Sequence, residues 1–121
     1  MKFNEVFQIV LESDGRVPQA ITVSRSKGFI KDFSKMIQNN PNKSRRMKED
    51  LEKLVKELEV NNLASCHKIR YCSDSAHQGY DAHLCGANSD HLIIIVKTFQ
   101  TNTFTLVTCG THSQLDKVLH N

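Results

Sequence analysis

Histidine is frequent in this chain of 121 residues, and most of its copies fall in a part that alternates like β-strands. Imidazole is the side chain best matched to proton transfer near neutral pH. Several histidines on one sheet would therefore indicate a general acid/base site, whereas the same residues scattered over a surface would indicate nothing. The five in this part of the chain are His67, His77, His83, His91 and His112.

One acidic residue and one histidine lie two positions apart in the strand expected from Tyr80 to Leu84. Because alternate residues of a strand point to opposite faces, Tyr80, Ala82 and Leu84 share one face. Asp81 and His83 then share the other. The pair is either part of a reactive site or a hydrogen-bonded surface pair, and spacing alone does not decide between them.

Cysteines and histidines alternate between Cys66 and His91, which raises the question of a metal site. Structural zinc ligands usually come in pairs two to four residues apart, and no CxxC or HxxxH pair occurs here. We therefore expect no metal. Cys85 and Cys109 lack a nucleophile signature, so we expect both to be buried thiols. The irregular cysteine spacing favours reduced thiols and a cytoplasmic location over a disulfide framework.

Length and composition indicate one soluble domain, since 39% of the residues are hydrophobic and 24% are charged. The longest apolar run, Leu92 to Val96, suits a buried strand and is too short to cross a membrane. Glu5 and Gln8 interrupt the stretch where a secretory leader would need its apolar core. We expect neither a membrane partner nor export.

The net charge of +3 is concentrated in one part of the chain. Residues 25–70 carry twelve Lys and Arg residues against six acidic residues, whereas acidic residues outnumber basic ones elsewhere. Such a distribution favours a polyanionic partner, although a solvated helical surface would produce it too.

Two amphipathic helices are expected in the basic segment. Ser26 can cap a helix that ends near Asn39-Asn40-Pro41, and a second helix runs from about Ser44 to Val60, where Asn61-Asn62 ends it. Their apolar residues recur at helical spacing, which predicts a helical hairpin with one buried face. These residues are Phe29, Ile30, Phe33, Met36, Ile37, Met47, Leu51, Leu54, Val55 and Leu58.

Short strand patterns follow, and one precedes the helices. The expected strands are Gln19 to Ser24, His67 to Tyr71, Tyr80 to Leu84, Leu92 to Thr98 and Thr103 to Thr108, the last two joined by a turn at Thr101-Asn102. We predict an α+β domain in which the two-helix hairpin packs on an antiparallel sheet of about four strands. Ser113 would cap a short C-terminal helix. Residues 3–11 read as a helix, or residues 7–11 as a strand that forms a hairpin with the strand at residue 19.

Four short motifs, in a fixed order, resemble the RelE/ParE superfamily of bacterial toxins, most closely its YafQ-like branch. The motifs are His67-Lys68-Ile69, Gly79-Tyr80-Asp81-Ala82-His83, Ser89-Asp90-His91 and Gly110-Thr111-His112. Each is weak alone, and their order after a two-helix prelude is more specific. The resemblance covers roughly residues 20–119 of a single domain, and residues 1–19 form an N-terminal extension.

The resemblance implies a ribosome-dependent mRNA endoribonuclease, the toxin of a type II toxin-antitoxin system. Its partners would be mRNA on the ribosome and a cognate antitoxin. Such enzymes use no metal or cofactor: a base takes the ribose 2′-hydroxyl proton, and an acid protonates the departing 5′ oxygen. Matched position by position, the catalytic residues are His67, His83, Asp90 and His112, with Asp81 a further acidic candidate. Lys68, Arg70 and Lys97 are the cations available to bind RNA.

The chain also departs from the family pattern. It is longer between His67 and Gly79 and between His83 and Asp90, and His91 stands where the family has a tryptophan. Asp116 stands where an aromatic residue is expected near the C terminus. Because such aromatics stack on bases, codon preference is expected to differ. The alternative function is a non-catalytic protein of the same fold, which inhibits a topoisomerase or another protein.

Overall fold

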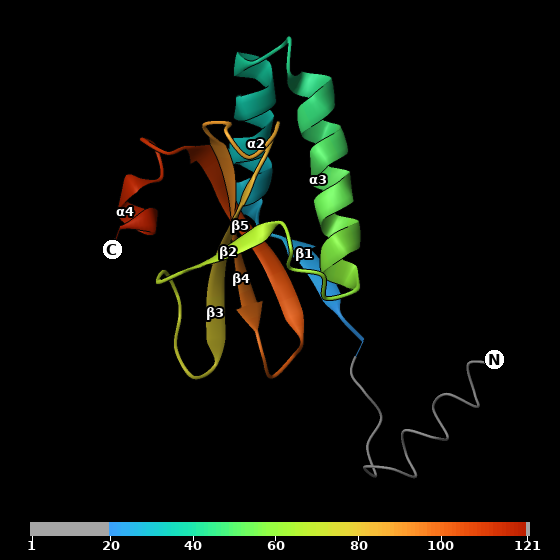
Figure 1. The fold of residues 1–121 in the computed structure, drawn as a ribbon, viewed down its shortest axis with the longest axis vertical. Helices are drawn as coiled ribbons and strands as arrows, with labels where there is room; N and C mark the ends of the chain where they lie inside the picture. The colour runs from blue at the N-terminus through green and yellow to red at the C-terminus, as the bar shows by residue number, and fades with distance from the viewer. Residues whose placement is uncertain (1–19, 121) are drawn as a thin grey trace, which may run out of the picture.

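The computed structural model describes residues 20–120, in which five strands and three helices form an α+β domain (Figure 1). The elements in chain order are β1 (Thr22–Arg25), α2 (Lys27–Asn39), α3 (Ser44–Glu59), β2 (Cys66–Ile69), β3 (His77–His83), β4 (His91–Thr98), β5 (Thr103–Thr111) and α4 (Asp116–Leu119). The alternative expectations for residues 3–11 lie outside the described residues.

The five strands form one sheet in the order β1-β5-β4-β3-β2. Strands β2 to β5 are an antiparallel meander, as predicted from the sequence. The strand that precedes the helices adds a fifth member, because β1 pairs with β5 in parallel. From β1 the chain passes through the helical hairpin to β2 at the opposite edge, so the parallel partner β5 follows only after the rest of the meander.

The helical hairpin forms where it was predicted. The Ser26 hydroxyl accepts a hydrogen bond from the Phe29 N–H at 3.0 Å and so caps α2. Asn61, with a φ of 56°, follows the end of α3 in the left-handed conformation that asparagine tolerates. Figure 1 shows the two helices side by side on one face of the sheet. Among the described residues, no helix is long and apolar enough to span a membrane.

Two apolar clusters, one on each face of the sheet, hold the layers together. The larger cluster lies between the sheet and the hairpin, and its fully buried members include Phe29, Met47, Leu58, Phe104 and Leu106. Burying side chains of this size stabilises the fold by about 2 kcal/mol each. Tyr80, Ala82 and Leu84, which the sequence places on one face of a strand, are all members of this cluster.

The smaller cluster lies on the opposite face of the sheet, which α4 covers only in part. Leu92 and Ile94 of β4 pack there against Leu115, Val118 and Leu119. The prediction that Ser113 caps this helix is wrong, because α4 begins after Leu115 and no side chain caps it. The intervening turn is closed by backbone bonds instead, from Leu115 N–H to the Thr111 carbonyl oxygen.

Candidate active site

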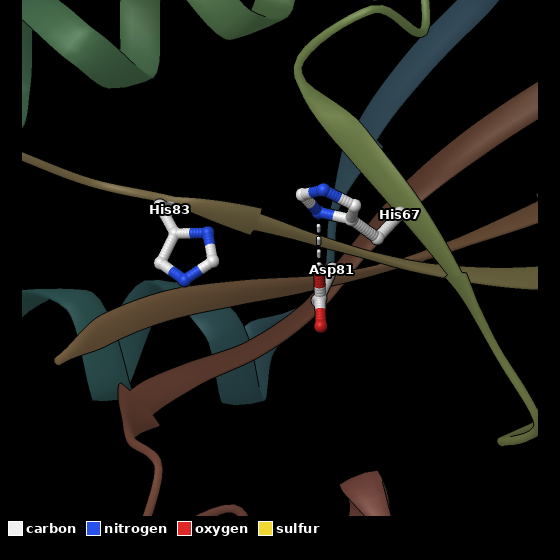
Figure 2. Close-up of side chains that lie close together, drawn as sticks. All are labelled: His67, Asp81 and His83. Carbon is white, nitrogen blue, oxygen red and sulfur yellow. Dashed lines mark ion pairs between the residues drawn. The ribbon is translucent and has the colours of Figure 1, made fainter. Parts of the chain in front are cut away.

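The imidazole of His67 lies against the carboxylate of Asp81 on the neighbouring strand. The two residues are directly opposite in the antiparallel register of β2 and β3, so their side chains leave the same face of the sheet. His67 Nδ1 and Asp81 Oδ1 are 3.4 Å apart, and the His67 side chain is 70% exposed (Figure 2). The pair thus places a solvent-facing imidazole above a carboxylate that the sheet holds in place.

Asp81 itself is largely enclosed, with 15% of its side chain exposed. Its Oδ1 atom is buried and accepts no hydrogen bond, so the contact with His67 is an ion pair when the imidazole is protonated. A buried acceptor without a hydrogen bond destabilises the folded state. Such an acceptor is more often found at a functional site than elsewhere in a protein.

His83 joins this pair to a third imidazole. It lies two residues beyond Asp81 on β3, and Figure 2 shows its ring beside them. The ring centroid of His83 is 6.1 Å from that of His67 and 5.8 Å from that of His112. Three imidazoles from separate parts of the chain therefore converge on the face that the hairpin leaves open.

His112 follows the end of β5 and is held by Asp90, which precedes β4. The His112 Nδ1 atom lies 2.7 Å from Asp90 Oδ1. The His112 backbone N–H also points at Asp90, 3.2 Å from its carbonyl oxygen and 3.3 Å from Oδ1. Because a carboxylate can only accept, Nδ1 donates, and Nε2 is left free to exchange a proton with a ligand.

The same contact sets the ionisation of Asp90. Hydrogen bonds from the His112 ring and, to a smaller extent, its backbone N–H lower the pKa of the Asp90 carboxyl below its ordinary value of 3.8. Asp90 is therefore a carboxylate at neutral pH, and it orients the imidazole without itself supplying a proton.

The loop that carries Asp90 is anchored to the helical hairpin by Asp50. The Cys85 backbone N–H donates to Asp50 Oδ2 at 2.7 Å, which joins the end of β3 to α3. Sequence reasoning did not identify Asp50 as important. It lies in a run of charged helix residues, and nothing in its spacing distinguishes it from its neighbours.

Buried apolar side chains of β4 adjoin the imidazoles. They were not identified from the sequence as part of the site. In the register of the sheet, Ile94 is opposite Asp81, and Leu92 is opposite His83. Both are fully buried and pack against Leu115. In the sequence, Leu92 to Val96 is a continuous apolar run, so it does not show which of these residues lie on which face of the sheet.

The three predicted RNA-binding cations do not gather at the imidazoles. Lys97 donates a hydrogen bond to Asn61 at 3.1 Å and lies 4.7 Å from the centre of the Phe104 ring, on the helix-covered face. Lys68 is opposite Tyr80, also a residue of that face, and Arg70 is exposed beyond the end of β2. Lys68 and Arg70 also line a hollow with Leu119 and His120 at the C-terminal helix. The five predicted catalytic residues meet, whereas among residues 20–120 no hydrogen bond or ion pair joins the three cations to them.

The remaining candidate nucleophiles and histidines lie elsewhere or are poorly suited. Burial raises the pKa of the Cys109 thiol to about 12, so no reactive thiolate forms at neutral pH. His91 lines a hollow of about 540 Å³ with Asp32 and Lys35 of α2, on the helix side of the sheet. Within residues 20–120, the convergent group is therefore His67, Asp81, His83, Asp90 and His112.

Comparison with known proteins adds information on the fold. No family model matches the sequence, and no curated protein matches it. Among solved structures, RelE in an archaeal RelE-RelB complex from Pyrococcus horikoshii OT3 is similar, with a TM-score of 0.57 and 13% identity. The likeness covers 79% of this chain and 99% of that one.

Two further solved structures share the architecture. A metal-bound toxin from Helicobacter pylori has a TM-score of 0.56 and 24% identity, over 78% of this chain and 98% of its own. YoeB from Staphylococcus aureus, solved as a dimer, has a TM-score of 0.53 and 18% identity, over 77% and 98%. Described residues 20–120 thus adopt the RelE-like toxin fold, over nearly the whole length of these proteins.

Proposed function

We propose that this protein is a ribosome-dependent mRNA endoribonuclease of the YafQ-like type, acting as the toxin of a type II toxin-antitoxin system. The observation that supports this proposal most strongly is the convergence of three imidazoles, two of them beside carboxylates, on one open face. The RelE-like fold is consistent with it.

Cleavage would proceed by attack of the RNA on itself. A neutral imidazole, His67 or His83, takes the proton from a ribose 2′-hydroxyl, and that oxygen attacks the adjacent phosphorus. The bond from phosphorus to the 5′ oxygen breaks, and His112 donates the proton that the departing oxygen needs. The products are a 2′,3′-cyclic phosphate and a 5′-hydroxyl, with no water or metal consumed.

Each carboxylate has a positioning role in this scheme. Asp90 fixes the His112 ring through Nδ1 and so presents Nε2 to the leaving oxygen. Asp81 lies 3.4 Å from His67 Nδ1 and so helps to position that ring over the sheet. Since the reaction needs one acid and one base, the third imidazole is available to donate a hydrogen bond to the phosphate as its charge builds.

Two partners follow from the proposal. Ribosomal RNA would contact the basic surfaces of α2 and α3, and such phosphate contacts weaken steeply as salt rises. A cognate antitoxin would cover the open face and keep the imidazoles from mRNA, as suggested by the RelE-RelB complex of the archaeal relative. An acidic antitoxin segment would suit the basic chain.

The test is cleavage of a defined mRNA on purified ribosomes by wild type, His112→Ala and a His77→Ala control. His77 is also a histidine of β3 paired with an aspartate, 3.0 Å from Asp74, but it lies at the far end of the strand from His83. We expect wild type and His77→Ala to cut equally and His112→Ala to be slower by about a hundredfold or more.

Other outcomes would contradict the enzyme. If wild type arrests growth but cuts no mRNA, or if His112→Ala cuts as fast as wild type, the imidazole group is not catalytic. The non-catalytic inhibitor of the same fold would then be the better account.

A further inference from the structure

A second chemical capacity is present at the edge of the imidazole group. His67, Asp81 and His83 each offer one donor atom, and these three atoms lie within 4.8 Å of one another (Figure 2). Among residues 20–120, no other three histidine, cysteine or acidic side chains gather this closely. Two imidazole nitrogens and one carboxylate oxygen are a donor set that Zn²⁺ and neighbouring transition metals prefer.

One of the three donor pairs already has the spacing that a bound ion requires. Metal–donor bonds of about 2.1 Å place the donors of a tetrahedral site roughly 3.4 Å apart. His67 Nδ1 and Asp81 Oδ1 are already at 3.4 Å. Because the His67 side chain is 70% exposed, rotation of its ring is unhindered by the core, and solvent can fill a remaining coordination position.

The buried carboxylate oxygen of Asp81 is an independent reason to expect a cation at this position. Asp81 Oδ1 is shielded from solvent and has no hydrogen-bond partner among the described residues. Taking a carboxylate oxygen out of water without a partner costs free energy, and a cation bound between Asp81 and the two imidazoles would offset that cost.

We propose that His67, Asp81 and His83 bind one divalent transition-metal ion of the Zn²⁺ class, and that the bound ion inhibits the RNA cleavage proposed above. Binding follows from the donor set alone, whereas inhibition rests on the proposed function. A coordinated imidazole has its nitrogen lone pair on the metal and is no longer a base, so His67 and His83 are both withdrawn from proton transfer. His112 stays on Asp90 and outside the ligand set.

This site was not expected from the sequence, because its ligands do not form the paired spacing of a zinc motif. Two of them, Asp81 and His83, alternate on one strand, and the third comes from the adjacent strand through the register of β2 and β3. Cross-strand pairing of this kind is fixed by the fold and leaves no fixed interval in the chain.

Binding is tested on the full chain, with Cys72→Ser in every sample because Cys72 is an exposed thiol. After treatment with a chelator and its removal, Zn²⁺ is titrated by calorimetry into this parent, into His67→Ala and His83→Ala, and into the control His77→Ala. We expect one ion per chain, bound at least tenfold more weakly by the two ligand variants and unchanged in the control. Circular dichroism checks that each variant is folded, and His67 is exposed enough for its removal to leave the core intact.

A second measurement locates the ion directly. Paramagnetic Co²⁺ should broaden the imidazole resonances of His67 and His83 and leave that of His77 sharp. Absence of one-to-one binding, equal binding by all variants, or broadening centred on His77 would overturn the site.

Inhibition has its own readout. Stoichiometric Zn²⁺ should slow mRNA cleavage by wild type and His77→Ala by about tenfold or more, and excess chelator should restore the rate. If Zn²⁺ binds at these residues but cleavage is unaffected, the regulatory part is wrong. If the chelated protein cuts no mRNA at all, the proposed function fails while the binding result still stands.

Discussion

At the scale of single residues, the site depends on two carboxylates in different environments. Asp81 is enclosed by the sheet, and Asp90 lies in an exposed loop with 62% of its side chain accessible. The first lies against His67 and offers the oxygen of the proposed metal site, and the second fixes the ring of His112. Both were predicted as site residues, but their different tasks follow only from burial and contacts.

The contact between Asp90 and His112 gives a prediction about ionisation. The carboxyl pKa of Asp90 should lie below 3.8 in wild type and rise toward 3.8 in His112→Ala, because the ring hydrogen bond is the largest cause of its lowering. Since the lowered pKa belongs to the folded state, this contact stabilises the fold above pH 3.8, and its contribution is lost as pH falls through the folded pKa.

Titration of the side-chain carboxyl carbons by nuclear magnetic resonance measures this value. Asp74 is the matched control, because the Ala76 N–H and the His77 ring lower its pKa independently of His112. An Asp90 pKa that is the same in both proteins would show that the contact with His112 does not exist in solution.

At the scale of elements, the register between β2 and β3 places His67 opposite Asp81. This strand pairing requires a residue without a side chain at Gly79. Gly79 is opposite Ile69, two residues along from His67 and Asp81. A Cβ atom at Gly79 would overlap with the Tyr71 carbonyl oxygen and press on the Ile69 side chain. The backbone must then move, so the strand pair and the site are coupled.

Gly79→Ala should therefore lower the free energy of unfolding by about 1 to 3 kcal/mol, the usual cost of overpacking. Gly110→Ala is the matched comparison in β5. Its Cβ would be 2.8 Å from Gln114 Oε1, the end of a side chain that can move away. Urea denaturation of both variants measures the difference. Equal stability of the two variants would contradict the importance of this close approach.

At the scale of the whole molecule, the two faces of the sheet differ in what they carry. The hairpin, with most of the basic residues, covers one face (Figure 1). The imidazoles lie on the other face, beside the smaller apolar cluster. The Lys97 side chain belongs to the helix-covered face, where it lies over Phe104. An RNA partner that uses both surfaces must therefore reach around an edge of the sheet.

The sequence predicted the elements and their faces well, because amphipathic spacing is strong in α2, α3 and β3. The placement of Lys97 was not among these successes: it shares a face with Ile93 and Ile95 of the larger cluster, and the continuous apolar run before it does not show which residues lie on that face. The contacts His67–Asp81 and Asp90–His112 could not be predicted from the sequence. Each joins residues from different strands or loops, and pairing register and loop closure are set by the packing of the whole domain.

The most direct test of the central claim is the chemistry of the RNA ends. Wild-type protein, kept in excess chelator, is incubated with ribosomes and a defined mRNA, and both new ends are identified. Transfer of the 2′-hydroxyl proton to an imidazole predicts a 2′,3′-cyclic phosphate, or the phosphate that forms when it opens, together with a 5′-hydroxyl. A 5′-phosphate, or cleavage that requires added metal, would contradict the account.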